Sequence, residues 1–62
     1  MSSKLLNAAE LGSVLGISRA SVYRRRSLGE PLPRAVRIGS LIRWRQEDIE
    51  AFLLEHLEEQ EK

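Results

Sequence analysis

The stretch LNAAELGSVLGISRASVYRRR, Leu6–Arg26, decides the fold that this sequence predicts. Apolar residues recur at helical spacing on both sides of Gly16, and four arginines are concentrated in the second half. Because glycine readily adopts the left-handed conformation that ends a helix, we expect two short helices joined by a tight turn. The second helix carries most of the positive charge of this stretch.

The first helix is expected to begin after Asn7, whose side chain can accept a hydrogen bond from a free amide of the first turn. Glu10 follows three residues later, which is the spacing of a capping box. Leu11 belongs to the apolar face, and Gly12 lies where another backbone can approach closely. Gly16 is expected to end this helix.

The second helix is expected over about Arg19–Leu28, with Ser18 as its N-cap and Gly29 just after its end. Its buried stripe is thin, because only Val22 and Leu28 supply it. Most of the surface of this helix is therefore left to polar and charged side chains.

A hairpin over about residues 35–45 follows an extended connector, Glu30–Pro33, in which each proline disfavours helix at the residue before it. A two-residue loop, Gly39-Ser40, suits a type II′ turn. A three-residue loop, Gly39–Leu41, instead gathers the apolar residues on one face. We prefer the three-residue loop, because shifting the strand pairing by one residue would move these apolar side chains onto opposite faces of the hairpin. The preferred register pairs Ile38 with Ile42, Val36 with Trp44, Arg37 with Arg43, and Ala35 with Arg45.

A last helix is predicted from about Gln46 to Glu58, with a buried stripe formed by Ile49, Phe52, Leu53 and Leu57. Glutamates at its end oppose the helix dipole, so we expect the acidic C-terminal end to fray. The sequence thus predicts one α+β, mainly α, domain over residues 1–62, ordered over about 5–57. Its architecture is a winged helix-turn-helix, with a two-stranded hairpin wing and a C-terminal helix.

The net charge of +1 conceals a strong separation of charge along the chain. Residues 1–46 hold nine basic and two acidic residues, a net +7, whereas residues 47–62 hold one basic and seven acidic residues, a net −6. Eight of the ten basic residues are arginine, which favours forked contacts to phosphate and guanine. A basic body with an acidic end indicates a polyanion-binding face and a separate second face. The plainer alternative is a solvated surface on which the signs happen to segregate.

The leading edge of the second helix has the properties that a DNA major groove requires. Small residues there allow close approach, and arginines on the same helix can reach base edges or phosphates. The hairpin offers a second contact, as a wing lying along the backbone or in the minor groove; alternatively, it only covers the core. The candidate DNA-binding residues are Ser18, Arg19, Ala20, Ser21, Tyr23, Arg24, Arg25, Arg37, Ser40 and Arg43.

Other chemistries lack the residues they need. There is no cysteine, so disulfides and thiolate metal sites are excluded. Trp44 is interpreted as a core residue and His56 as a boundary residue, because no second histidine could complete a metal or catalytic site. No nucleophile–base pair or phosphate loop is present, so we expect no enzyme activity, no cofactor and no metal.

The motifs match one family in order through residues 5–54. The matching residues are Leu5-Leu6, Ala9-Glu10-Leu11, Leu15-Gly16-Ile17-Ser18-Arg19, Ser21-Val22-Tyr23-Arg24, Gly29, Pro33, Ile38-Gly39, Arg43-Trp44, Asp48-Ile49 and Ala51-Phe52-Leu53. With this set the chain resembles the AlpA-like and excisionase-type small DNA-binding proteins, a branch of the MerR-like winged helix-turn-helix group. It departs from them at Arg25 and Arg26, where relatives usually have aliphatic residues, and at Arg45, where they often have a Ser or Asp cap.

The resemblance implies a sequence-specific double-stranded DNA-binding protein of a prophage or mobile element. It would act in transcription regulation, for example of an integrase gene, or as an excisionase in DNA recombination; the residues do not separate these roles. Possible further partners are a second copy on DNA and an integrase or other protein at the acidic helix. The alternative is a protein-interaction module whose acidic helix docks on a basic partner without DNA binding. No signal peptide or membrane span is apparent, so we expect a cytoplasmic protein, bacterial or phage-encoded and nucleoid-associated.

Overall fold

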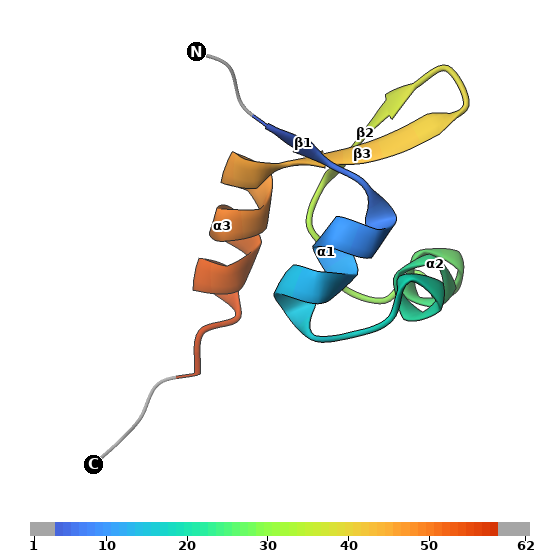
Figure 1. Ribbon diagram of the computed structural model, residues 1–62. Coiled ribbons are helices and arrows are strands. Elements are labelled where there is room, and N and C mark those ends of the chain that lie inside the picture. The colour runs from blue at the N-terminus through green and yellow to red at the C-terminus, as the bar shows by residue number, and fades with distance from the viewer. Residues whose placement is uncertain (1–3, 59–62) are drawn as a thin grey trace.

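The computed structural model describes residues 4–58 and contains three helices and a three-stranded sheet (Figure 1). The expected α+β, mainly α, winged helix-turn-helix architecture is confirmed, with one short strand added at its start. The fraying expected beyond Glu58 lies outside the described residues. In chain order the elements are β1 (Leu5–Leu6), α1 (Ala8–Leu15), α2 (Arg19–Leu28), β2 (Ala35–Ile38), β3 (Leu41–Arg45) and α3 (Gln46–Glu55).

Helix α1 is fixed at both ends by the residues that the sequence indicated. The Glu10 amide donates to the Asn7 side chain at 2.8 Å, and the Asn7 amide donates to the Glu10 carboxylate at 2.9 Å. Both halves of the capping box are therefore formed. Gly16 ends the helix with φ of 79°, in the left-handed region that favours glycine.

Gly12 allows the turn after α1 to fold back onto the helix. The Ile17 amide donates to the Gly12 carbonyl at 2.8 Å. A Cβ atom at position 12 would lie only 2.5 Å from the Ile17 carbonyl oxygen. The close backbone approach expected at this glycine is thus confirmed, and it sets the direction in which the chain leaves towards α2.

Helix α2 has the expected caps but a thinner buried stripe than expected. The Ser18 hydroxyl accepts a hydrogen bond from the Ser21 amide at 3.1 Å, and Gly29 ends the helix with φ of 74°. Val22 is fully buried, but Leu28 is 61% exposed, so the prediction that Leu28 is buried is wrong. At about 100° per residue, Leu28 points about 120° away from Val22, and α2 packs against α1 on the Val22 side.

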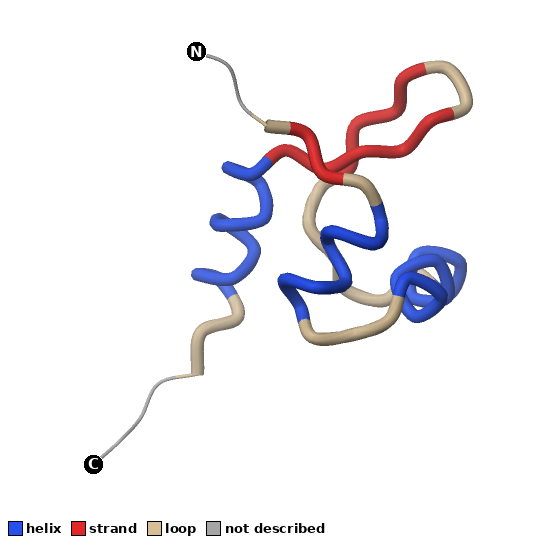
Figure 2. Tube along the Cα trace, viewed as in Figure 1, coloured by secondary structure: helices blue, strands red, loops and turns tan. Residues whose placement is uncertain are grey.

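The sheet has the order β1-β3-β2, with both pairs antiparallel (Figure 2). Strand β1 was not predicted, because two residues are too short for an alternating pattern to be recognised. It pairs Leu6 with Trp44 and Leu5 with Arg45. Residues Leu5 and Leu6 are thereby held against the strand that leads into α3.

The hairpin register differs from the preferred prediction. Ile38 pairs with Leu41 across a two-residue Gly39-Ser40 loop, which moves every pairing by one residue. Gly39 has φ of 60°, and no described non-glycine residue has a positive φ, so the turn is of type II′. The prediction failed because it assumed that one whole face is buried, whereas the outer half of this hairpin extends beyond the core (Figure 1).

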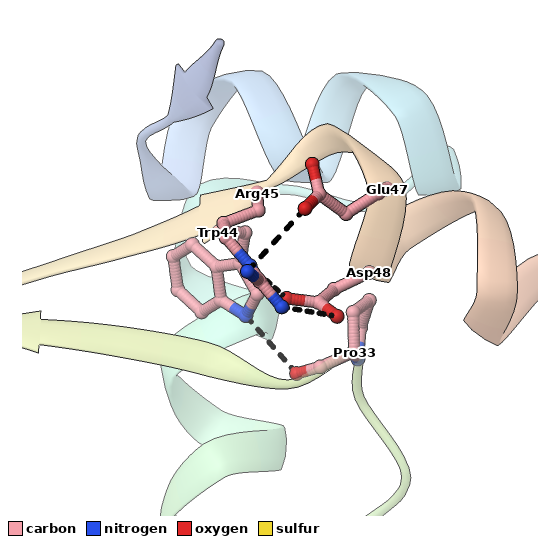
Figure 3. Close-up of polar contacts among 5 residues, drawn as sticks. All are labelled: Pro33, Trp44, Arg45, Glu47 and Asp48. Atoms are coloured by element: carbon pink, nitrogen blue, oxygen red, sulfur yellow. Dashed lines mark hydrogen bonds and ion pairs between the residues drawn. The ribbon is translucent and has the colours of Figure 1, made fainter. Parts of the chain in front are cut away.

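The core lies where α1, α2, α3 and the sheet meet, and Trp44 is at its centre. Trp44 is fully buried, as predicted, and its indole nitrogen donates to the Pro33 carbonyl at 3.2 Å (Figure 3). This hydrogen bond ties the connector to β3 and satisfies the polar end of the indole. The other members of the buried hydrophobic cluster are Leu6, Ala8, Leu11, Val22 and Ile49, with Leu15, Ile17, Leu32 and Ile42 packed against them.

Helix α3 is shorter and less buried than predicted. It ends at Glu55 rather than near Glu58. Ile49 is buried and Phe52 is half-buried, but Leu53 and Leu57 are 42% and 71% exposed. Periodicity identified a stripe that only the first half of the helix can bury, because α3 leaves the body soon after β3 (Figure 1).

Candidate nucleic-acid interface

The exposed surface of α2 holds most of the residues predicted to contact DNA. Arg19, Ala20, Tyr23 and Arg24 are exposed, and Ser21 is half-buried. Arg24 lies about 160° around the helix from Val22, so it points away from α1. Because Val22 is the one buried residue of α2, most of the surface of this helix is left to solvent.

The first turn of α2 is ordered by its two serines. The Ser18 hydroxyl accepts from the Ser21 amide and donates to the Ser21 hydroxyl, both at 3.1 Å. The Ser18 side chain therefore already serves as the N-cap of α2, and a phosphate contact would be a second role for it. The remaining free amides at the start of this helix favour an anion.

Arg19 and Tyr23 form a pair one helical turn apart. The guanidinium carbon of Arg19 lies 5.3 Å from the centre of the Tyr23 ring, within the range of a cation–π contact. Such a contact restricts the long arginine side chain without neutralising its charge. Arg19 is thus partly oriented before any ligand arrives.

The other α2 arginines differ in exposure. Arg25 is half-buried, while Arg24 and Arg26 are exposed. Among residues 4–58 no carboxylate forms an ion pair with an α2 arginine. Figure 1 shows why: α1 lies between α2 and α3.

The corrected hairpin register separates two arginines that were expected to lie opposite each other. Arg37 pairs with Ile42, and Arg43 pairs with Val36, so the two arginines lie on opposite faces of the hairpin. Arg37 is exposed on the face that carries Trp44. Arg43 is half-buried, and its Nη1 donates to the Ile42 carbonyl at 2.8 Å.

Ser40 is exposed in the turn at the hairpin tip. The apolar neighbours of the turn, Ile38 and Leu41, are also exposed, at 48% and 50%. Sequence reasoning placed Ile38 in the core-facing stripe and so missed this pair. The signal that could have found it was the type II′ preference of Gly39-Ser40, which fixes the register in which the two are neighbours.

Arg45 is removed from the candidate interface by its contacts with α3 (Figure 3). Its Nε and Nη2 donate to the two Asp48 oxygens at 2.6 and 3.1 Å, and its Nη1 lies 3.3 Å from a Glu47 oxygen. The hydrogen bond from Arg45 lowers the pKa of the Asp48 carboxyl, with a further contribution from the charges of Arg45 and Arg34. Arg45 has no side-chain cap bond as the N-cap of α3, so this forked pair fixes the start of the helix instead.

The geometry therefore gathers basic residues on α2 and the hairpin, at one side of the molecule, and acidic residues on α3 at the other (Figure 1). Within residues 4–58, no group of acidic and histidine side chains could hold a metal ion. No helix in that part of the chain has the length and apolar character needed to span a bilayer.

Comparison with known proteins identifies this arrangement. A family model described as a helix-turn-helix domain matches residues 5–57. The chain belongs to the helix-turn-helix family. No curated protein and no solved structure matches it.

As a helix-turn-helix protein, the chain is a DNA-binding protein, and helix-turn-helix domains are generally not enzymes. Helices α1 and α2 are the two helices of the motif, and Gly16–Ser18 is its turn. In this motif the second helix lies in the major groove. The helix that would do so here is α2, which carries four arginines and no acidic residue.

Proposed function

We propose that this protein binds a specific double-stranded DNA sequence through the exposed face of α2 and the β2–β3 hairpin. The observation that carries the proposal is that Arg19, Tyr23 and Arg24 are all exposed on a helix that carries no acidic side chain. A helix held from behind by one buried residue can enter a major groove without disturbing the core.

Each candidate residue has a role that follows from its position. Arg19 and Arg24 contact guanine edges, and Ala20 and Ser21 allow the helix to approach closely. Tyr23 orients Arg19 and offers its hydroxyl to a phosphate oxygen. Phosphate contacts, which position the protein without reading sequence, come from Ser18, Arg25, Arg37, Ser40 and Arg43.

The resemblance to AlpA-like and excisionase-type proteins supports a role in a prophage or other mobile element. There the protein would either regulate a gene, such as an integrase gene, or promote excision. The two roles are distinguished by measuring reporter expression from a promoter and excision between attachment sites in the same cells. A change in one readout alone assigns the role.

The DNA-binding proposal is tested by selecting duplexes from a random pool and measuring affinity for the enriched sequence at increasing salt. Each phosphate contact steepens the slope of log affinity against log salt by about 0.9. We expect enrichment of one sequence and a slope equivalent to several phosphates. Absent enrichment together with salt-insensitive binding would contradict the proposal.

A protein partner at α3 is a second candidate function, because Leu54 and Leu57 are 70% and 71% exposed beside acidic residues. This surface fits a basic partner with apolar side chains, such as an integrase, or the basic face of a second copy on adjacent DNA. It is compatible with DNA binding, since α3 lies on the other side of α1 from α2 (Figure 1). Comparing per-site affinity on one-site and two-site duplexes tests self-association; equal affinities would exclude it.

A further inference from the structure

We propose that Ile38 and Leu41 form an apolar wedge at the hairpin tip, which enters the DNA minor groove and unstacks one base step. This inference rests on the proposed DNA binding and assigns the tip a different task from that of α2. Leucine and isoleucine are among the side chains with which minor-groove proteins open base steps and kink the duplex.

The register places these two side chains together. Ile38 pairs directly with Leu41 on either side of the type II′ turn, so both project from the same face at the end of the ribbon. That face is opposite the one that carries Trp44. The two residues of the turn, Gly39 and Ser40, are small and allow the tip to enter a narrow groove.

The body of the molecule does not cover this pair. Ile38 and Leu41 remain 48% and 50% exposed even though each is next to the other, whereas Ile42, one residue further along, packs against the core. Figure 1 shows the hairpin extending away from the helices. The apolar pair therefore lies at the end of the hairpin, beyond the core, where it can be buried only by another molecule.

The surroundings of the pair favour DNA over a protein as that molecule. Arg37 and Arg43 flank the tip on both faces of the ribbon, and residues 35–45 contain no acidic side chain. The hairpin and α2 also extend towards the same side of the molecule (Figure 1). Apolar side chains flanked by arginines are complementary to a minor groove, which lies between two phosphate backbones. The arginines would contact the phosphates while Ile38 and Leu41 contact the bases.

The experiment uses the full chain and a duplex enriched by selection, with 2-aminopurine placed at successive positions and fluorophores at the two ends. We expect the wild-type protein to raise 2-aminopurine fluorescence at one step and to shorten the end-to-end distance. The double variant I38T/L41T keeps β-forming residues, should lose both signals, and should bind about tenfold more weakly.

The matched control is V14T, which makes polar a valine that is 50% exposed on α1 and has no assigned role in binding, and it should leave both signals unchanged. Thermal melting of each variant checks that it is folded. Wild-type binding without any fluorescence change would overturn the wedge and leave the proposed function standing. Loss of self-association in I38T/L41T with unchanged bending would instead assign the tip to a protein contact. If no duplex is enriched, the proposed function itself fails.

Discussion

Helices α2 and α3 are alike in length and burial but opposite in charge. Each has ten residues, and each has a single buried residue, Val22 in α2 and Ile49 in α3. Helix α2 carries four arginines and no acidic residue, while α3 carries four acidic residues and no basic one. They lie on either side of α1 (Figure 1).

The two helices are held in different ways, and this difference indicates what their surfaces are free to do. Helix α2 has a side-chain cap at its start and a left-handed glycine at its end, so its ends are satisfied locally. Helix α3 has neither, and its start is fixed by the ion pair of Arg45 with Asp48. The charges of α2 are therefore available to a ligand, whereas part of the charge of α3 is used within the protein.

The largest expected effect comes from removing the buried residue of either helix. Ile49→Ala should lower the free energy of unfolding by about 2–5 kcal/mol, and Val22→Ala by somewhat less because it deletes fewer atoms. Urea unfolding measures both. Only Val22→Ala should also weaken DNA binding once affinity is corrected for the folded fraction, since Val22 alone is buried in α2. If both variants lost the same DNA affinity after correction for the folded fraction, the assignment of α2 as the binding helix would be contradicted.

The next effect is on DNA affinity, through the charges. Arg24→Ala should cost about 1–3 kcal/mol of binding free energy and relax specificity at one base pair. Arg37→Ala should weaken binding to all sequences alike, because a phosphate contact carries no sequence information. The matched control on α3, Glu50→Gln, should leave affinity unchanged or slightly raised. Fluorescence anisotropy on the selected duplex and on single-base variants of it tests all three; wild-type affinity for both arginine variants would show that the interface is misplaced.

Local chemistry made α1, α2 and their turn predictable from sequence. The capping box at Asn7, the caps at Ser18 and Gly29, and the close approach at Gly12 each depend on residues within a few positions of one another. These interactions carry a recognisable spacing, so the arrangement of the two helices could be predicted without knowing the rest of the fold.

The features that failed depend on how far the core extends. The hairpin register was chosen to bury one face, but the core ends before Ile38 and Leu41. The same assumption extended α3 too far and buried Leu57. At the hairpin the local signal was better, because the turn chemistry of Gly39-Ser40 gave the correct register. For a domain of this size, an apolar side chain is weak evidence of burial.

The candidate site was predictable to a similar degree. The exposure of Tyr23 and Arg24 follows from α2 alone, because helical periodicity places them about 100° and 160° around the helix from the buried Val22. Arg19 lies only about 60° from Val22, so periodicity does not predict its exposure. The positions of Arg37 and Arg43 depended on the register, so they were misplaced relative to each other. The pairing of Arg45 with Asp48 was missed although its spacing of three residues was visible in the sequence.

A smaller effect separates capping from DNA contact at the start of α2. Ser18→Ala removes the hydrogen bond to the Ser21 amide and should cost about 1 kcal/mol of stability. Ser18→Asp keeps a capping oxygen and adds a charge that the helix dipole favours, so stability should be retained. Its negative charge should nevertheless weaken DNA binding, because this turn lies against phosphates in the proposed complex. Retained affinity in Ser18→Asp would show that the turn does not face DNA.

The smallest effect is a pH dependence confined to the α3 side. The hydrogen bond from Arg45 lowers the pKa of Asp48 in the folded protein, so this carboxylate stabilises the fold above its unfolded pKa of about 3.9. That contribution is lost as the pH falls through the lower, folded pKa, where Asp48 becomes protonated. The stability difference between wild type and Asp48→Asn should therefore be constant near neutral pH and shrink at acidic pH, as measured by urea unfolding across that range. At neutral pH Asp48→Asn should not weaken DNA binding, because it removes a negative charge from α3, the helix that DNA does not contact in the proposed complex, and leaves the Arg45 cation at the end of β3 in place; a marked loss of affinity would mean that the two sides of the molecule are coupled.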